Sequence, residues 1–296
     1  MTNLSGKLCK CSFVLLLGFT LLCVSFNAFA GDESRPPLRH LAIPYANFNT
    51  GFGTGFDIEL VKLFAKKIGR PYEYVETSWE KVIPDLIGKE ISVSGNEVTV
   101  GKDVPIRGDI ICTGFTVLPW REKLVAYSEP TFPTQVWLVT TSNSPLSPIT
   151  PSGDLQKDIE AVRSMVKGRS VMGIKGTCLD PALYDIEKAG GIAKNFRGSL
   201  NDLAGALIRG ESETILLDAP DVFVALQKWP GEIKIIGPVS EEQLMACAVR
   251  KEDVELLESF NLFLRELRQS GDYMRLVEKY YPAAIIYFPE FFKLDK

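Results

Sequence analysis

The stretch from residue 41 to residue 75, LAIPYANFNTGFGTGFDIELVKLFAKKIGRPYEYV, decides the fold class. It begins with a short apolar strand, and a glycine-rich turn at residues 51–55 follows. Apolar residues then recur at helical spacing from Phe56 to Ile68, and Gly69 ends the helix. Residues 72–75 predict a second strand. A strand, a helix and a second strand in this order are typical of a parallel sheet with helices packed on it.

The same alternation continues along the chain. A helix is predicted at residues 82–87 and a third strand at residues 109–112, and residues 143–153 form a loop rich in proline and serine. A second series follows, with strands expected at 170–174, 192–196, 214–217, 233–236 and 244–249 and helices at 179–188, 200–208 and 256–267. The chain therefore predicts two α/β modules of similar order. Sheets of this kind bind ligands at the carboxyl ends of their strands.

Residues 91–100 depart from this alternation of strands and helices. Their side chains alternate between apolar and polar around the turn-forming centre Gly95-Asn96, which predicts a β-hairpin. Because the hairpin precedes the third strand, we expect the insertion at residues 90–108 to lie at the edge opposite the ligand crevice.

The first 30 residues have the pattern of a cleaved signal peptide. Lys7 and Lys10 precede an almost wholly apolar run at residues 12–26, and residues 28–30, Ala-Phe-Ala, match the small-x-small pattern that a leader peptidase cuts after. The run is short for a membrane span, which needs about 20 residues. An uncleaved anchor and a lipoprotein formed through Cys23 stay open as alternatives. We expect an exported protein.

The net charge limits the class of partner. Without residues 1–30 the chain has 31 basic and 37 acidic side chains, a net charge of −6. Nucleic acids and anionic membrane surfaces recruit positive charge, so neither is an expected partner.

Cysteine and histidine usage limits the chemistry. Cys112, Cys178 and Cys247 follow the predicted leader, and an odd number in an oxidising compartment leaves at least one thiol free. Their spacing resembles no metal site. His40 is the only histidine of the chain, which argues against Ser-His-Asp and Cys-His catalysis and against histidine-rich zinc sites. We expect His40 to be exposed or at a sheet edge, and we expect no metal and no cofactor.

Five short motifs in order resemble the type 2 periplasmic solute-binding family, the bacterial extracellular solute-binding protein family 3 that serves polar amino acid ABC transporters. The resemblance covers residues 38–282. The motifs are GFDIEL at 55–60, SWEKVIPDL at 78–86, DIICTGFTV at 109–117 with Arg121 and YSEP at 127–130, GIKGT at 173–177, and LLDA at 216–219.

The resemblance implies an architecture and a function. The fold would be α/β, a two-lobed periplasmic binding protein of type II (a Venus flytrap), each lobe being a mixed or parallel sheet flanked by helices. Lobe 1 would comprise residues 31–138 and 243–296, and lobe 2 residues 139–242, after a signal peptide at 1–30. The protein would be a periplasmic monomer, and no enzyme. By closing its lobes it would capture a small amino-acid-like ligand for an ABC transporter permease.

The resemblance also assigns the ligand's charged groups. Arg121 would bind the carboxylate, because a guanidinium offers a rigid two-pronged donor, with help from the hydroxyl of Thr116 and the backbone near Gly114. Thr177 is expected at a helix start, where free N–H groups favour an anion. Asp218, at a strand end, would accept the ammonium. A solvated Arg121 and an N-capping Asp218 stay open as alternatives.

Further residues would shape the pocket. Trp79 and Phe48 match positions that sandwich the ligand side chain in relatives, and Tyr45 lies three residues before Phe48. Lys175 matches a position that touches that side chain in some relatives. Core packing of the aromatic residues and a solvated Lys175 are the alternatives. The first ligand loop, between Leu41 and Gly55, is shorter than in relatives and lacks their acidic residue, so the ligand's side chain is not assigned.

Two other functions fit the same fold. Some periplasmic relatives are cyclohexadienyl or arogenate dehydratases with a carboxyl group as general acid, and Asp221 lies near where they carry a glutamate. The other alternative is a ligand-sensing partner of a membrane receptor or a cell-wall enzyme, which the hairpin insertion would support.

Overall fold

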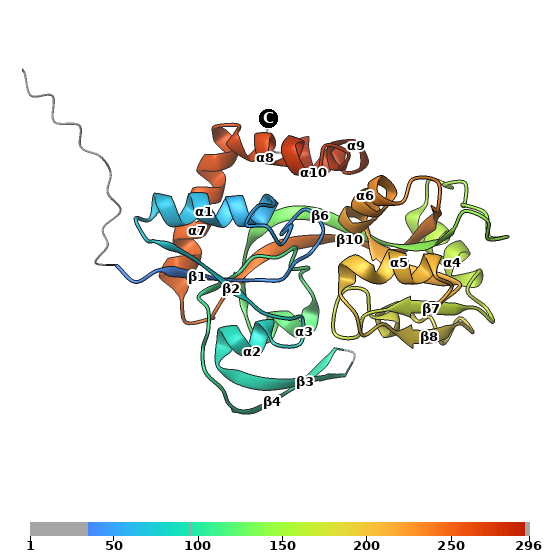
Figure 1. Ribbon diagram of the computed structural model, residues 1–296, viewed down its shortest axis with the longest axis horizontal. Coiled ribbons are helices and arrows are strands. Elements are labelled where there is room, and N and C mark those ends of the chain that lie inside the picture. The colour runs from blue at the N-terminus through green and yellow to red at the C-terminus, as the bar shows by residue number, and fades with distance from the viewer. Residues whose placement is uncertain (1–34, 95, 294–296) are drawn as a thin grey trace, which may run out of the picture. The chain divides into compact units, whose positions relative to one another are not determined.

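The computed structural model describes residues 35–94 and 96–293, and the predicted signal peptide at residues 1–30 lies outside them. Figure 1 shows the arrangement of the helices and strands. The strands are β1 (Leu38–Ala42), β2 (Tyr72–Glu76), β3 (Lys89–Ser94), β4 (Glu97–Asp103), β5 (Ile110–Ile111), β6 (Ala126–Thr141), β7 (Ser170–Gly173), β8 (Ile192–Asn195), β9 (Thr214–Asp218) and β10 (Ile233–Val249).

Eight of these strands form one sheet in the order β2-β1-β5-β10-β6-β9-β7-β8. Strands β2, β1 and β5 are parallel in lobe 1, and β9, β7 and β8 are parallel in lobe 2. The long antiparallel strands β6 and β10 run between these two groups and pair with each other. The predicted mixed α/β class is confirmed, and the boundaries at residues 138 and 242 stay a prediction.

The two predicted strands at 233–236 and 244–249 are a single strand, β10. Its pairing with β6 shifts register between Pro238 and Glu242, and Gly237 has a φ of 156°. A proline cannot donate to a sheet ladder and a bulge bends the strand, so the irregularity divides the pairing without ending the strand. We propose this segment, with its partner on β6, as the hinge between the lobes.

Helices cover both faces of the sheet in lobe 1. In Figure 1, α1 lies above β1 and β2 and α2 lies below them. The helices of lobe 1 are α1 (Phe56–Lys67), α2 (Val82–Ile87), α3 (Pro119–Glu122), α7 (Val254–Gln269), α8 (Asp272–Tyr280), α9 (Ala284–Tyr287) and α10 (Pro289–Lys293). The strand–helix–strand order predicted for residues 41–75 is confirmed.

Lobe 2 is built from the helices α4 (Leu155–Ser164), α5 (Leu203–Ile208) and α6 (Ala219–Lys228) and the 3₁₀ turns η1 (Pro181–Tyr184) and η2 (Leu200–Asp202). The helix predicted at 179–188 is wrong. Asp180 caps a single 3₁₀ turn by accepting from Ala182 N, and Asp185 ends the turn in the left-handed region at φ 55°. A non-glycine residue in that region cannot continue a right-handed helix.

His40 is fully buried, so its predicted exposed or edge position is wrong. It lies on β1, which is hydrogen-bonded on one side to β2 and on the other to β5. Its ring nitrogens lie 3.0 Å from the Tyr72 hydroxyl and 2.7 Å from the Cys112 carbonyl oxygen. Burial lowers the pKa of His40 to about 4, so this imidazole is a neutral part of the core.

The predicted hairpin is confirmed as the antiparallel pair β3–β4, a small sheet separate from the main one. Its predicted position is wrong. Lys123, directly after α3, donates from Nζ to the Asn96 carbonyl oxygen at 2.9 Å. Since α3 carries Arg121, the hairpin tip lies on the side of the Arg121 site and not opposite it.

A disulfide joins Cys112, next to β5, to Cys247 on β10, and Cys178 is free and buried. The expectation of at least one free thiol is confirmed. The bond links two neighbouring strands of lobe 1 that are 135 residues apart in the sequence.

The aromatic residues near the C-terminus pack on the sheet. Phe292 contacts Phe132 in lobe 1, with ring centroids 5.9 Å apart. Tyr287 contacts Trp137 and, on α6, Phe223, with centroid distances of 5.7 and 5.1 Å. The C-terminal aromatic side chains therefore pack against other rings of the protein.

Candidate functional site

The predicted site residues come from loops that leave the carboxyl ends of parallel strands. Tyr45 follows β1, Gly114 and Thr116 follow β5, Thr177 follows β7, and Asp218 ends β9. In a parallel sheet these ends meet at one edge, which is where α/β proteins place their ligands. The structure brings side chains from both lobes together there.

Arg121 is 2% exposed, so the solvated alternative is wrong. Its Nη1 donates to the Thr116 carbonyl oxygen at 2.9 Å, and its Nη2 to the Gly176 carbonyl oxygen of lobe 2 at 3.3 Å. Its guanidinium carbon lies 4.2 Å from the centroid of the Phe115 ring. Nε has no hydrogen-bond partner, and no ion pair involving Arg121 is found among residues 35–94 and 96–293.

A buried cation without a counter-ion is costly, because desolvation penalises its charge. The same burial lowers the pKa of Arg121. The guanidinium stays charged in proteins, so the site has an unbalanced positive charge with a free donor. This arrangement favours a carboxylate or another planar anion as the missing partner.

Asp218 is fully buried and its two oxygens have different partners. Oδ1 accepts from Asp221 N at 3.2 Å, which makes Asp218 the N-cap of α6 and confirms the capping alternative. Oδ2 accepts from the Tyr45 hydroxyl of lobe 1 and from Cys178 Sγ at 3.7 Å. Burial raises the pKa of Asp218 to about 6.

Asp221 lies one helical turn beyond Asp218 and is also buried, with Oδ2 unpartnered. Burial and the adjacent charge of Asp218 raise its pKa well above the ordinary value. The proximity of two buried carboxyl groups at one helix end therefore disfavours their simultaneous ionisation.

The Tyr45 ring lies between other rings of lobe 1. It stacks on Phe48 at a centroid distance of 5.4 Å and meets Trp79 edge-on at 5.7 Å. Phe48 itself lies deeper, in contact with Phe56 and Tyr281 at 6.1 and 4.9 Å. The Trp79 ring centroid lies 5.9 Å from the guanidinium carbon of Arg121, and the buried Nε1 of Trp79 has no hydrogen-bond partner.

Gly114 makes this packing possible. Its φ is 58°, in the left-handed region, and a Cβ built on it would lie 2.3 Å from Tyr45 Cε1. Its N–H donates to Asp57 Oδ2 at 2.6 Å, so the backbone donor near Gly114 is already used inside lobe 1. Burial raises the pKa of Asp57 to about 7.

The two predicted threonines differ in their hydrogen bonding. Thr116 is buried and its hydroxyl has no partner, so it can serve a ligand. The Thr177 hydroxyl donates to the Ile174 carbonyl oxygen at 2.7 Å and accepts from Leu179 N at 3.1 Å. Thr177 therefore belongs to a tight turn, and its predicted place at the start of a helix is wrong.

Hydrogen bonds between the described residues link lobe 1 to lobe 2 at this edge. Among them are the Tyr45–Asp218 bond, the Arg121–Gly176 bond, and a bond of 2.8 Å from Ala46 N to Asn201 Oδ1. Sequence reasoning gave no role to Asn201 or Cys178. Cys178 directly follows the GIKGT motif and could have been found there, whereas Asn201 lies in a segment without a motif.

Lys175 lines a cavity of about 710 Å³ at the mouth of the site. Trp79 of lobe 1 and Phe196 and Arg197 of lobe 2 line it as well. A smaller cavity of about 190 Å³, behind Ala46, is lined by Asp221 and by the mostly apolar side chains of lobe 2.

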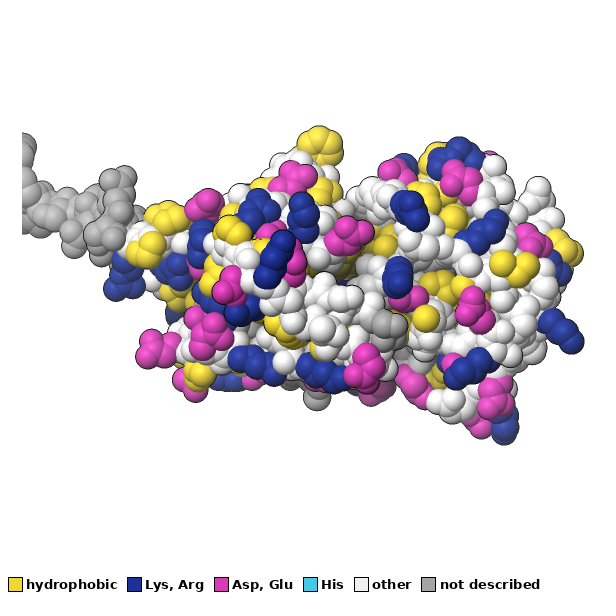
Figure 2. All heavy atoms as spheres, turned by 90° about the horizontal axis from the view of Figure 1, so that it is seen from below, with side chains coloured by type: hydrophobic (Ala, Val, Ile, Leu, Met, Phe, Trp, Pro, Cys, Tyr) yellow, Lys and Arg dark blue, Asp and Glu magenta, His cyan; other side chains and the backbone are white. Residues whose placement is uncertain are grey.

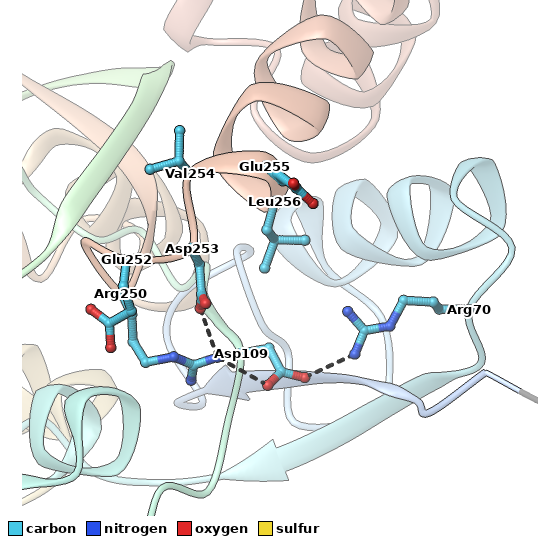
Figure 3. A pocket seen from close by; sticks show the side chains of 8 residues that line it. All are labelled: Arg70, Asp109, Arg250, Glu252, Asp253, Val254, Glu255 and Leu256. Carbon is cyan, nitrogen blue, oxygen red and sulfur yellow. Dashed lines mark hydrogen bonds and ion pairs between the residues drawn. The ribbon is translucent and has the colours of Figure 1, made fainter.

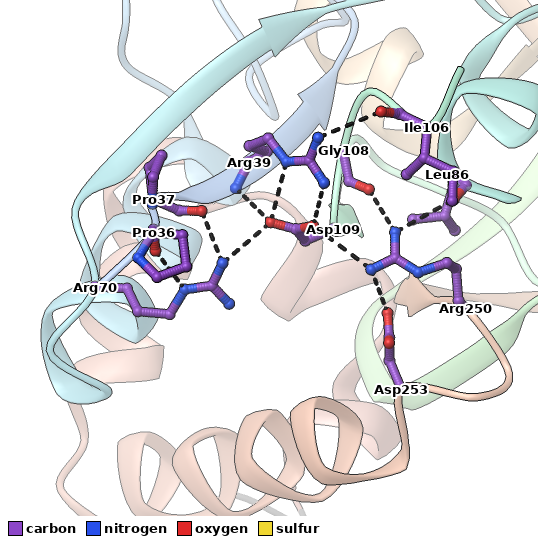
Figure 4. A network of polar contacts seen from close by, with 10 residues as sticks. All are labelled: Pro36, Pro37, Arg39, Arg70, Leu86, Ile106, Gly108, Asp109, Arg250 and Asp253. Carbon is purple, nitrogen blue, oxygen red and sulfur yellow. Dashed lines mark hydrogen bonds and ion pairs between the residues drawn. The ribbon is translucent and has the colours of Figure 1, made fainter. Parts of the chain in front are cut away.

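Another cavity, of about 560 Å³, lies away from this edge and is charged (Figure 3). At its base Asp109 binds three guanidinium groups, from Arg39 at 2.7 Å, Arg70 at 3.2 Å and Arg250 at 3.5 Å (Figure 4). Burial opposes ionisation, but the hydrogen bonds from Arg39 and the nearby charges lower the pKa of Asp109. The charged groups of this network pair with one another and hold the starts of β1 and β5 to the start of α7. The network therefore lacks an unpaired donor of the kind found at Arg121.

The surface carries charges of both signs. Figure 2 shows Lys and Arg side chains interspersed with Asp and Glu over one face, with no extended basic patch. In the part of the chain that the structure describes, no helix has the length and apolar character needed to cross a membrane. The same residues contain no cluster of histidine, cysteine and acidic side chains that could hold a metal ion.

Comparison with known proteins identifies similar chains. The family model described as bacterial extracellular solute-binding proteins, family 3, matches residues 41–103 and 106–283. The histidine-binding periplasmic protein of Escherichia coli (strain K12) is 25% identical over 278 residues, covering 91% of this chain and 95% of that protein.

Solved structures agree with this. A mutant of ArgBP from T. maritima matches with a TM-score of 0.67 and 27% identity over 83% of this chain and 95% of its own. The ancestral amino acid-binding protein AncCDT-1, a precursor of cyclohexadienyl dehydratase, matches with a TM-score of 0.62 and 23% identity, over 83% of this chain and 95% of its own. At that identity the likeness shows the fold alone.

Proposed function

Because the chain belongs to the bacterial extracellular solute-binding proteins, family 3, we propose that it captures a small amino-acid-like carboxylate between its lobes. The observation that carries this proposal is Arg121, a buried guanidinium whose Nε has no partner and which forms no ion pair within the part of the chain that the structure describes. A ligand carboxylate would supply the missing counter-ion and add two charge-assisted hydrogen bonds.

The site also suggests how binding closes the lobes. Arg121 belongs to lobe 1, and its hydrogen bond to the Gly176 carbonyl oxygen reaches lobe 2. Asp218 of lobe 2 would face the other end of the ligand. A ligand that contacts both lobes binds the closed form more tightly than the open one and shifts the population toward it.

The other predicted ligand contacts remain part of this proposal. Thr116 would add its free hydroxyl to the carboxylate, and Trp79 and Tyr45 would contact the ligand's body. Lys175 would face its distal end from the 710 Å³ cavity. Phe48 would not contact the ligand directly but would hold the Tyr45 ring in place by stacking on it. Gly114 would act through its backbone, and Thr177 by shaping the turn next to Gly176.

The proposal extends to the delivery of the ligand and to the location of the protein. We propose that residues 1–30 direct export to the periplasm, where the monomeric protein would deliver its ligand to an ABC transporter permease. The histidine-binding relative of Escherichia coli is periplasmic by name, which supports this location.

A thermal-shift screen of amino acids and related carboxylates tests the proposal, because a ligand that binds only the folded protein raises its melting temperature. Calorimetry then compares the wild type with Arg121→Ala, Arg121→Lys and, as a control, Arg275→Ala on the exposed start of α8. We expect Arg121→Ala to weaken binding by about 30-fold or more, since one charged partner is lost, and Arg275→Ala to leave it unchanged. Equal affinities for all four proteins would refute the proposal.

A second candidate, a dehydratase-like enzyme, has one observation in its favour. The buried carboxyl of Asp221 lies next to Asp218, burial and that neighbouring charge raise its pKa, and a buried acid of raised pKa can act as a general acid. Incubation of the purified protein with prephenate, followed by detection of phenylpyruvate, distinguishes the two functions. Binding without turnover is the result expected of a solute-binding protein, and turnover lost in Asp221→Asn would favour the enzyme.

A further inference from the structure

Hydrogen-bond donors and acceptors are unequally satisfied around the candidate cleft. Three buried groups that can donate have no partner, namely Arg121 Nε, the Thr116 hydroxyl and Trp79 Nε1. Buried donors without partners are rare and costly, so they indicate where a ligand places its acceptors. These three donors lie on lobe 1 and favour a ligand group that is anionic or rich in hydrogen-bond acceptors.

On the opposite side, Asp218 already has its donors. Its Oδ2 accepts from the Tyr45 hydroxyl and the Cys178 thiol, and its Oδ1 accepts from Asp221 N. The remaining unpartnered acceptor of α6 is Asp221 Oδ2, and Asp221 lines the 190 Å³ cavity behind Ala46 rather than the 710 Å³ cavity beside Trp79.

Packing holds the Tyr45 hydroxyl at Asp218. The Tyr45 ring is 1% exposed, stacks on Phe48 and meets Trp79 edge-on. Gly114 lies so close beneath it that a Cβ there would meet the ring at 2.3 Å. A ring enclosed on these sides has little freedom, so its hydroxyl is preorganised as the donor to the carboxylate.

Oδ1 of Asp218 accepts from Asp221 N within α6, whereas Oδ2 accepts from Tyr45 of lobe 1 and from Cys178, which uses both of its acceptor sites. An α-ammonium that reaches Asp218 from lobe 1 would therefore compete with the Tyr45 hydroxyl for Oδ2. An amino acid would have to displace the hydroxyl and leave it buried without an acceptor, whereas a carboxylate without an ammonium leaves the bond intact. We infer that Tyr45 is a specificity-determining residue and that the cleft prefers small carboxylates lacking an α-ammonium over the corresponding amino acids. This inference rests on the proposed function, because it assumes that Arg121 binds the ligand carboxylate.

Matched pairs of ligands that differ only in the α-ammonium test the inference. The probes are 3-phenylpropanoate with L-phenylalanine, 4-methylpentanoate with L-leucine, and glutarate with L-glutamate, titrated by calorimetry. For the wild type we expect the acid of at least one pair to bind about tenfold or more tightly than its amino acid, since the amino acid breaks a hydrogen bond to a charged group and leaves the Tyr45 hydroxyl without an acceptor.

Tyr45→Phe keeps the ring and removes the hydroxyl, so Asp218 becomes free to accept an ammonium. We expect the preference within that pair to shift toward the amino acid by about tenfold or more. Tyr273→Phe is the matched control, because Tyr273 is equally buried and donates its hydroxyl to the Thr131 carbonyl oxygen at 2.8 Å within lobe 1. It should leave the preference unchanged.

The outcomes separate the inference from the proposed function. A wild type that prefers the amino acids, or a Tyr45→Phe variant with the wild-type preference, overturns the inference and leaves the proposed function standing. Binding of none of the six probes, while another carboxylate binds in an Arg121-dependent manner, also overturns the inference alone. If no carboxylate binds in an Arg121-dependent manner, both are overturned.

Discussion

Arg121 and Asp218 differ in how completely the protein itself satisfies them. Arg121 keeps a free buried donor, whereas both oxygens of Asp218 have partners from the protein. The motif around residues 109–121 indicated a ligand arginine, and the structure adds that it is buried and unpaired. No sequence pattern could indicate the Tyr45–Asp218 bond, because it joins side chains 173 residues apart across two lobes.

Gly114→Ala tests how tightly the site residues are packed. The residue has a φ of 58°, and a Cβ would lie 2.3 Å from Tyr45 and 2.7 Å from Phe48. We expect loss of ligand binding and a fall in the free energy of unfolding of about 2–4 kcal/mol, from backbone strain and overpacking together. Chemical denaturation and calorimetry measure the two effects.

Gly153→Ala is its control, because Gly153 has a φ of 83° and nothing within 4 Å of the added Cβ. Gly153→Ala should lower the free energy of unfolding by on the order of 1 kcal/mol, through the strain of a left-handed backbone conformation alone, and should leave ligand binding unchanged. Equal losses in the two variants would contradict the packing argument.

Asp57→Asn tests a pH dependence at the residue scale. Burial raises the pKa of Asp57 from 3.8 to about 7 in the folded state. The folded protein therefore holds this proton more tightly than the unfolded chain, and the stabilising contribution is full below pH 4 and lost as the pH rises through 7. Relative to Asp57→Asn, the wild type should lose up to about 4 kcal/mol of unfolding free energy between pH 4 and pH 8. Parallel pH profiles of denaturation for the two proteins would contradict the shift.

At the scale of single elements, sequence periodicity predicted the helices α1 and α7 and most of the short strands, but it missed the long strand β6 and the helices α4 and α6. Helix α1 has a buried apolar stripe from Phe56 to Ala65, which the spacing of its residues indicates directly. The helix expected at 179–188 failed because Asp180 and Asp185 end the turn locally, and capping of this kind leaves the apolar spacing unchanged. The predicted exposed position of His40 was wrong because β1 is paired on both sides. One of its neighbours, β5, lies 70 residues further along the chain, so the sequence around His40 does not indicate this pairing.

The disulfide between β5 and β10 gives a prediction for these elements. Cys112 and Cys247 close a loop of 135 residues, and a cross-link of this kind restricts the unfolded chain. Replacing both by alanine should lower the free energy of unfolding by about 2–5 kcal/mol. Denaturation with and without dithiothreitol provides the control, because the reductant should weaken the wild type and leave the double variant unchanged. A double variant as stable as the oxidised wild type would contradict this role.

At the scale of the whole molecule, the motif order predicted the family and the two-lobed fold, and the family match confirms both. Sequence could not show that a single sheet runs through both lobes on β6 and β10, because its order depends on pairings between distant segments. It also could not show the lobe-to-lobe bonds at Asp218, Gly176 and Asn201. Under the proposed function the ligand binds between the lobes, where these contacts form, and its binding is coupled to closure of the lobes.

A structure of the protein with a carboxylate from the thermal-shift screen tests the central claim most directly. We predict a carboxylate oxygen about 2.8 Å from Arg121 Nε, in the cleft between the lobes, with its second oxygen within reach of the same guanidinium or the Thr116 hydroxyl. A ligand bound elsewhere, for example in the cavity beside Asp109, with Arg121 Nε still unpartnered, would contradict the account.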